Sequence, residues 1–237
     1  MTRRSSLGAE QPGRSCARSA DRRPMASPNR LTYLAHMTLP SAADVLKAQL
    51  RHAWVNARWV LEDLDDDEYF WEPTPLCWSV RRRAQLVHGW GRGEFICEDG
   101  WPPTEPVPVP TIAWRVIHLA AWTDIYREWT FGDERPRLRD FDVPGDAPGG
   151  LTWLQNAQDS FASAVDALDD VSVFELRPAH WGESLPIVHL VTSMLTEHVH
   201  HIAEVGVLRD LHRGHARRQP PPPPTPGPQW WAGGSTS

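Results

Sequence analysis

The stretch that most constrains the fold runs from Pro186 to Leu211, because no proline interrupts it and its apolar residues recur at helical spacing. These residues are Leu190, Val191, Met194, Leu195, Ile202, Val205 and Leu208. A spacing of three and four residues predicts an amphipathic helix whose apolar face points into a core.

Within this helix, residues 197–201 read Glu-His-Val-His-His and place a carboxylate and three imidazoles close together. Glu197 and His201 are four residues apart, so their side chains stack on one face and can close on one divalent metal. His198 falls nearest the middle of the apolar face, whereas His200 lies towards the polar side. A structural alternative stays open, with His198 in the core and Glu197 and His201 forming a solvated pair.

Apolar periodicity and capping residues predict three further helices. The four predicted helices cover residues 41–64, 111–131, 151–169 and 187–212. Ser41 and Thr111 stand at the N-cap positions of the first two. His118 lies in the most hydrophobic of the helices, where a single histidine is more often a core residue than a ligand. Between the first two helices, Glu68–Pro110 shows little regular patterning, and we expect an ordered loop that packs over a site.

Composition excludes several classes of protein. The chain of 237 residues is 41% hydrophobic, and none of its apolar runs reaches the roughly 18–20 residues of a membrane span. The net charge of −6 combines a basic first 36 residues with an acidic remainder, which argues against nucleic-acid binding. Three cysteines without CxxC spacing argue against a disulfide framework and favour a reducing, cytoplasmic location.

The chain has room for one domain with tails. Residues 1–39 are rich in Arg, Ser and Pro, and we expect a disordered extension, with Met37 as an alternative start of the native protein. Residues 40–213 are predicted to form the folded domain. Residues 214–237 contain a run of prolines and a Gly/Ser end, and we expect a disordered tail.

Three stretches of this sequence resemble the DinB-like superfamily of metal-binding four-helix bundles, which includes mycothiol-dependent maleylpyruvate isomerases and thiol S-transferases. They are Glu-Tyr-Phe-Trp-Glu-Pro at 68–73 with Cys-Trp-Ser-Val-Arg at 77–81, Thr-Ile-Ala-Trp-Arg-Val-Ile-His-Leu at 111–119, and the segment 197–211. The resemblance covers residues 41–213 and implies an all-α, up-down four-helix bundle.

The metal site of this family has three histidines, one on the second helix and two spaced four apart on the fourth. The resemblance places these ligands at His118, Glu197 and His201, and this chain departs from the pattern by its carboxylate at 197. Two histidines and a glutamate suit zinc, and nickel or iron would also fit. His200 and Glu204 are expected to orient the imidazoles from behind.

Two classes of function with a bound metal or ligand remain open from the sequence, beside a purely structural or dimeric partner protein in which His118 and Glu197 are buried and metal-free. In the first, the protein is a metal-dependent enzyme that performs thiol transfer, isomerisation or hydrolysis on a small molecule, with a low-molecular-weight thiol as a cosubstrate. In the second, it is a non-catalytic bundle that binds a metal or a ligand in a stress-response or sensor role. A homodimer is compatible with either class, and the sequence contains no P-loop, Rossmann fingerprint or Ser-His-Asp motif.

Overall fold

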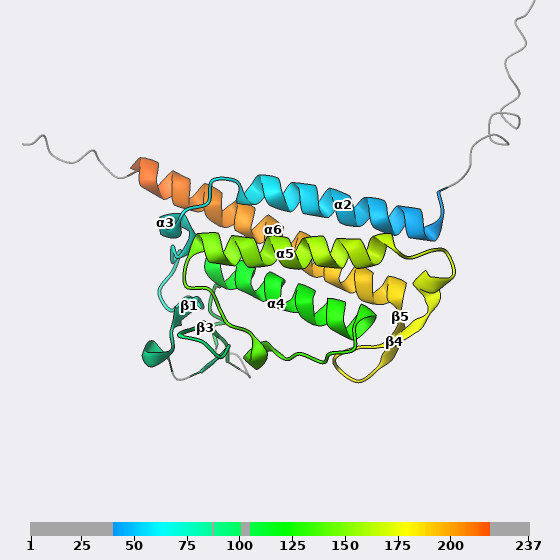
Figure 1. The fold of residues 1–237 in the computed structure, drawn as a ribbon. Coiled ribbons are helices and arrows are strands. Elements are labelled where there is room, and N and C mark those ends of the chain that lie inside the picture. Colours follow the sequence, from blue (N-terminus) through cyan, green and yellow to red (C-terminus); the bar gives the residue numbers. More distant parts are fainter. Residues whose placement is uncertain (1–39, 87, 101–104, 219–237) are drawn as a thin grey trace, which may run out of the picture. The chain divides into compact units, whose positions relative to one another are not determined.

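The computed structural model describes residues 40–86, 88–100 and 105–218, and within them four long helices form a bundle (Figure 1). These helices are α2 (Ala42–Leu61), α4 (Ile112–Phe131), α5 (Ala147–Asp166) and α6 (Ile187–Arg218). The predicted all-α four-helix bundle is confirmed. The predicted extension at residues 1–39 and residues 219–237 of the predicted tail lie outside the described residues.

The neighbouring helices α4 and α5 run in the same direction. Trp153 donates a hydrogen bond to Asp124 at 2.8 Å, and further along both helices Phe161 packs against Phe131. The connection of residues 132–146 makes this possible, because a chain of that length can span up to about 50 Å. A helix of 20 residues such as α5 is about 30 Å long. The bundle therefore departs from simple up-down alternation, and α2 and α6 also run in the same direction, because Trp54 packs on His198 and Arg209 donates to Val60 O further along both helices.

Two helix ends differ from the predicted positions. Helix α2 stops at Leu61 and not at Leu64, because Asp63 adopts a left-handed backbone conformation with φ of 56° that a helix cannot contain. Helix α6 continues to Arg218, past the predicted end at residue 212 and into the predicted tail. The basic, proline-free segment before the proline run is thus helical.

Helix α5 begins four residues before its predicted start at Leu151. The side chain of Asp146 accepts a hydrogen bond from the backbone N–H of Gly149 at 2.7 Å and caps the helix. Pro148 occupies the first turn, where its missing N–H costs no hydrogen bond. The two glycines at 149 and 150 hid this start from the apolar pattern.

The segment predicted to be an ordered loop, Glu68–Pro110, contains a small antiparallel sheet in the order β1-β3-β2, which corrects the prediction of little regular structure. The elements are α3 (Asp66–Tyr69), β1 (Val80–Arg82), β2 (Gly89–Trp90) and β3 (Phe95–Glu98), with Val80 opposite Cys97. Strands of two to four residues carry too little alternation to be recognised in the sequence. The backbone N–H of Thr111 donates to Trp78 O at 2.8 Å, so the sheet is fixed to the start of α4.

A second small hairpin lies at the opposite end of the bundle, between α5 and α6 (Figure 1). It consists of β4 (Leu176–Pro178) and β5 (Ser184–Pro186), with Leu176 opposite Pro186. Three short 3-10 helices complete the described elements: η1 (Arg83–Gln85), η2 (Leu138–Asp140) and η3 (Ser172–Phe174).

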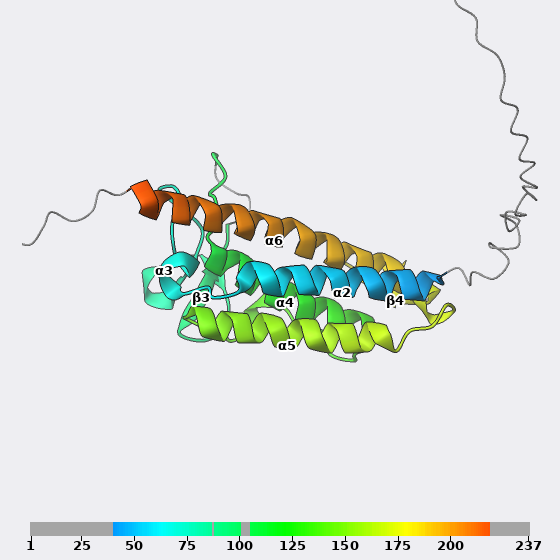
Figure 2. The ribbon, with the colours of Figure 1, turned by 90° about the horizontal axis from the view of Figure 1, so that it is seen from above.

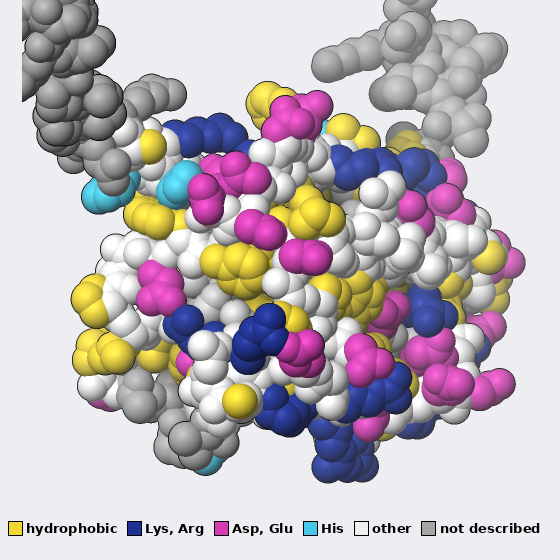
Figure 3. All heavy atoms as spheres, turned by 60° about the vertical axis from the view of Figure 1, so that its left-hand side comes forward, with side chains coloured by type: hydrophobic (Ala, Val, Ile, Leu, Met, Phe, Trp, Pro, Cys, Tyr) yellow, Lys and Arg dark blue, Asp and Glu magenta, His cyan; other side chains and the backbone are white. Residues whose placement is uncertain are grey.

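Large buried side chains from all four long helices fill the bundle. They include Leu50 and Trp54 of α2, Ile117 and Leu119 of α4, Leu154 and Phe161 of α5, and Leu190 and Met194 of α6. Seen from above, α2 lies between α5 and α6 (Figure 2). Acidic and basic side chains are interspersed on the face shown in Figure 3, with hydrophobic side chains between them. Among the described helices, none is both long and apolar enough to cross a membrane.

Candidate metal centre

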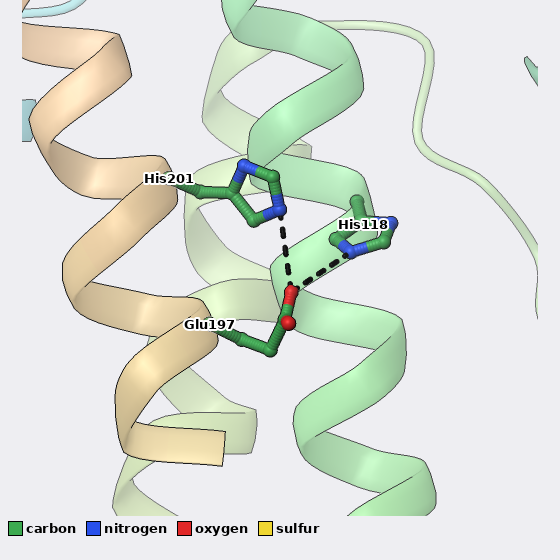
Figure 4. A group of neighbouring side chains, drawn as sticks. All are labelled: His118, Glu197 and His201. Atoms are coloured by element: carbon green, nitrogen blue, oxygen red, sulfur yellow. Dashed lines mark ion pairs between the residues drawn. The ribbon is translucent and has the colours of Figure 1, made fainter. Parts of the chain in front are cut away.

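Three side chains from two helices converge on one point between α4 and α6 (Figure 4). His118 comes from α4, and Glu197 and His201 come from successive turns of α6. Glu197 Oε2 lies 3.7 Å from His118 Nε2 and 3.4 Å from His201 Nε2. One potential ligand atom from each residue lies within 4.8 Å of the other two. The structure thus brings together the three residues that the sequence predicted as ligands.

The position of His118 follows from the packing at the start of α4. Thr111 caps this helix by accepting a hydrogen bond from the N–H of Trp114, and Trp114 stacks on the His118 ring with the centroids 4.6 Å apart. Trp114 is itself held because its Nε1 donates to Glu98 O of β3 at 2.7 Å. The small sheet therefore fixes the indole that orients His118.

The protonation states of His118 and Glu197 favour a cation. Burial lowers the pKa of His118, so this imidazole is neutral at pH 7. The imidazoles of His118 and His201 lower the pKa of Glu197 well below its ordinary value, which keeps the carboxylate ionised. Burial would lower the pKa of His201, but Glu197 and Glu204 outweigh it and raise that pKa. A metal binds the neutral form of this imidazole, so it competes with a proton for His201.

The ring of His201 is held from behind by Glu204. The Nδ1 atom of His201 lies 2.7 Å from Glu204 Oε2, and the same oxygen accepts a hydrogen bond from Arg115 Nε at 2.8 Å. Burial would raise the pKa of Glu204, but Arg115 and His201 outweigh it and lower that pKa to about 2. A proton on Nδ1 donated to this carboxylate leaves Nε2 free to face Glu197 and His118.

Both predicted supporting residues contact His201. Glu204 makes a polar contact with its ring nitrogen, and His200 stacks on its ring. The exposed His200 reaches Glu204 Oε1 with its Nε2 at 3.2 Å, and its ring stacks on His201 at 4.9 Å between centroids. Sequence reasoning missed Arg115. This residue is buried and completes a series of side-chain contacts from α4 through Glu204 to His201. An arginine inside the nearly apolar run of residues 112–122 was the available signal.

A cavity of about 230 Å³ opens beside the cluster, lined by His118, Trp122, Tyr126, His180 and Glu197. His180 belongs to the turn between β4 and β5, and its ring packs 4.6 Å from Trp122. Sequence reasoning did not select His180, because it lies in a turn outside the helices and no spacing pattern links it to the ligand candidates. The cluster is therefore accessible to a small molecule.

The family model of the DinB superfamily matches residues 49–205, which is more than half of the chain and includes all three ligand candidates. The chain belongs to the DinB superfamily, as the resemblance predicted. Among solved structures, a DinB-like protein from Bacillus cereus ATCC 10987 is similar in fold. The two share a TM-score of 0.51 and 12% identity over 73% of this chain and 94% of that one. None of the curated proteins matches the chain.

Proposed function

We propose that this protein is a metal-dependent enzyme that acts on a small molecule, with the metal held by His118, Glu197 and His201. The observation that carries the proposal is the spacing of the donor atoms. Separations of 3.4 and 3.7 Å are longer than an N–H···O hydrogen bond. Ligands at about 2.0–2.2 Å from a tetrahedral zinc ion lie about 3.3–3.6 Å apart. The separations from Glu197 to the two imidazoles are therefore close to those between ligands of a bound ion.

The chemistry of the donors supports the same assignment. A neutral imidazole and an ionised carboxylate are the protonation states that a metal requires. Two histidines and one glutamate favour zinc, with nickel or iron as alternatives. Metal binding is also frequent among members of the DinB superfamily.

Three protein ligands leave one coordination position for a reactant, which is the arrangement of catalytic and not of structural sites. A bound divalent ion at such a site lowers the pKa of a water or thiol and so supplies a nucleophile at neutral pH. The surrounding residues position the metal ligands: Glu204 and Arg115 hold His201 in one orientation, and Trp114 holds His118. The cavity beside Glu197 admits a substrate of limited size. The reaction classes that this arrangement supports are thiol transfer, isomerisation and hydrolysis.

The first test is the metal content of the purified, tag-free protein, followed by zinc titration of the wild type and of Glu197→Ala. We expect about one zinc per chain in the wild type and a strong loss in the variant. His52→Ala on the exposed face of α2 is the matched control and should keep full binding. Equal zinc affinity of wild type and Glu197→Ala would refute the assigned ligands.

The second test separates catalysis from a sensor role. The metal-loaded protein is supplied with a low-molecular-weight thiol and a set of small electrophiles, and consumption of the thiol is followed with time. Turnover that disappears in His201→Ala supports the enzyme. Stoichiometric binding without turnover would favour the non-catalytic alternative.

A further inference from the structure

Helix α4 carries tryptophans beyond the metal-centre cavity, and they line a second and larger cavity. This cavity has a volume of about 460 Å³. Its lining residues are Trp90, Trp122, Ile125, Trp129, Pro136, Arg137, Leu138, Arg139 and His180. We call it the aromatic trough. Its size falls within the range of natural small-molecule sites.

The aromatic trough adjoins the candidate metal centre. Trp122 and His180 line both the trough and the cavity beside Glu197. A third cavity of about 420 Å³ reaches His118 and shares Trp90, Trp122 and Leu138 with the trough. Trp122 stands at the junction of all three spaces. Along α4, Trp129 follows His118 by eleven residues, so the trough extends about 16 Å from the centre.

The trough combines apolar walls with positive charge at its rim. Arg137 and Arg139 flank Leu138 on η2 and are exposed, and within the described ranges neither guanidinium forms an ion pair. Two nearby carboxylates are engaged elsewhere. Asp140 accepts the backbone N–H of Arg137 at 2.8 Å, and Glu128 pairs with Arg127 at 2.6 Å. Two exposed arginines that form no ion pair within the described ranges therefore line an indole-walled cavity.

We propose that the aromatic trough binds a planar, aromatic or conjugated carboxylate, with its ring system against Trp122 and Trp129 and its carboxylate at Arg137 and Arg139. Indole walls favour flat apolar molecules, and arginine pairs favour carboxylates through charge-assisted hydrogen bonds. The inference rests on the proposed function in one respect, since it takes the metal centre as the reacting end of the same substrate. It adds the chemical class of that substrate.

The test uses 2-naphthoate as the probe and 2-naphthamide as its uncharged match, with binding measured by titration calorimetry on the full chain in the presence of a chelator. We expect the wild type to prefer the carboxylate by roughly tenfold. The double variant Arg137→Gln/Arg139→Gln should lose this preference and keep its affinity for the amide. Arg51→Gln/Arg58→Gln, on the exposed face of α2, is the control and should behave as the wild type.

A second pair of variants tests the ring site. Trp122→Leu should weaken both probes by roughly tenfold, whereas Trp59→Leu, an indole 76% exposed on α2, should change neither. Thermal melting of each variant shows whether it is folded. Equal binding of the two probes, no binding of either, or a carboxylate preference that survives the double arginine variant would each overturn the inference.

His201→Ala separates this inference from the proposed function, because His201 lines neither the trough nor the cavities that join it. Probe binding that persists in this variant while zinc binding is lost supports both proposals. Probe binding that requires His201 would place the carboxylate at the metal centre and refute the trough site. Zinc affinity that survives in His201→Ala would refute the metal site and leave the trough unaffected.

Discussion

His198 and His201 lie three residues apart on α6 and occupy opposite kinds of environment. His198 is 1% exposed, packs in a tilted arrangement against Trp54 with the ring centroids 4.1 Å apart, and has its Nε2 2.7 Å from Gln158 Nε2. His201 faces α4, with charged partners at both ring nitrogens. Burial lowers the pKa of His198 to about 3, whereas two carboxylates raise that of His201. The partners and the pKa of each imidazole therefore depend on which neighbouring helix its ring faces. The variants below test this difference between His198 and His201.

The largest expected effect is on metal affinity in His201→Ala. Removing one of three protein ligands should weaken zinc binding on the order of 1,000-fold. The measurement is competition with a chromogenic chelator at pH 7.5. His198→Ala is the matched variant one turn away and should bind zinc as the wild type does. A His198→Ala protein that loses zinc while Glu197→Ala retains it would require a ligand set built around His198.

The His198→Ala variant should have a lower unfolding free energy than His201→Ala. It deletes a fully buried ring that packs on Trp54, and such truncations cost about 3 kcal/mol of unfolding free energy. Urea denaturation in the presence of a chelator measures this cost. We expect His201→Ala to lose less than half as much, and the opposite ranking would contradict the contrast.

His198 should also make the stability of the metal-free protein depend on pH. Its pKa is lower in the folded state, so below pH 6.5 the unfolded chain binds a proton that the folded chain does not. Stability due to this residue is therefore present above pH 6.5 and lost as the pH falls, by about 2 kcal/mol at pH 5. The comparison is with His198→Gln, which cannot titrate. Parallel stability curves for the two proteins between pH 7.5 and 5 would rule this out.

A smaller effect on zinc affinity is expected for variants of Glu204 and His200, which support the ring of His201. Glu204→Gln keeps an oxygen near His201 Nδ1 but removes its charge, and should weaken zinc binding about tenfold. His200→Ala should weaken it less than Glu204→Gln, because His200 reaches the cluster through Glu204 and through stacking. Calorimetric titration of both variants checks the order, and a larger loss in His200→Ala would contradict it.

The smallest effect is expected for Glu197→His, which restores three imidazoles at the cluster. Zinc affinity should stay within about tenfold of the wild type, because histidine is as competent a ligand as glutamate. Measured beside Glu197→Ala, this variant shows whether the position requires a ligand or only a carboxylate. A loss as large as that of Glu197→Ala would mean that the charge is indispensable.

The sequence predicted the elements that carry strong helical patterns and missed those defined by contacts. Helix α4 begins and ends where Thr111 and Gly132 indicated, and His118, Glu197 and His201 meet as the family resemblance implied. The resemblance was needed for this, because periodicity alone left His118 as a core histidine. That these residues bind a metal stays a prediction.

Other parts of the site could not be predicted because they depend on residues distant in the chain. Arg115 reaches Glu204 across 89 residues, and no local pattern records that meeting. His180 joins the cavity through the turn of a two-stranded hairpin with three-residue strands, too short for a periodic pattern. The start of α5 was missed for a local reason, since Gly149 and Gly150 suggested a loop where Asp146 and Pro148 had already begun a helix.

The position of α2 between α5 and α6 has a consequence for biosynthesis. Its Trp54 and Val60 contact residues that lie 104 and 149 positions later, at Gln158 and Arg209. At about 5–20 residues per second, α2 waits roughly 7–30 s on the ribosome before its last partner is made. During that time α5 can cover one side of α2, but the side that packs on α6 stays uncovered. A chain interrupted before α6 therefore presents chaperones and proteases with an amphipathic helix that is only partly docked.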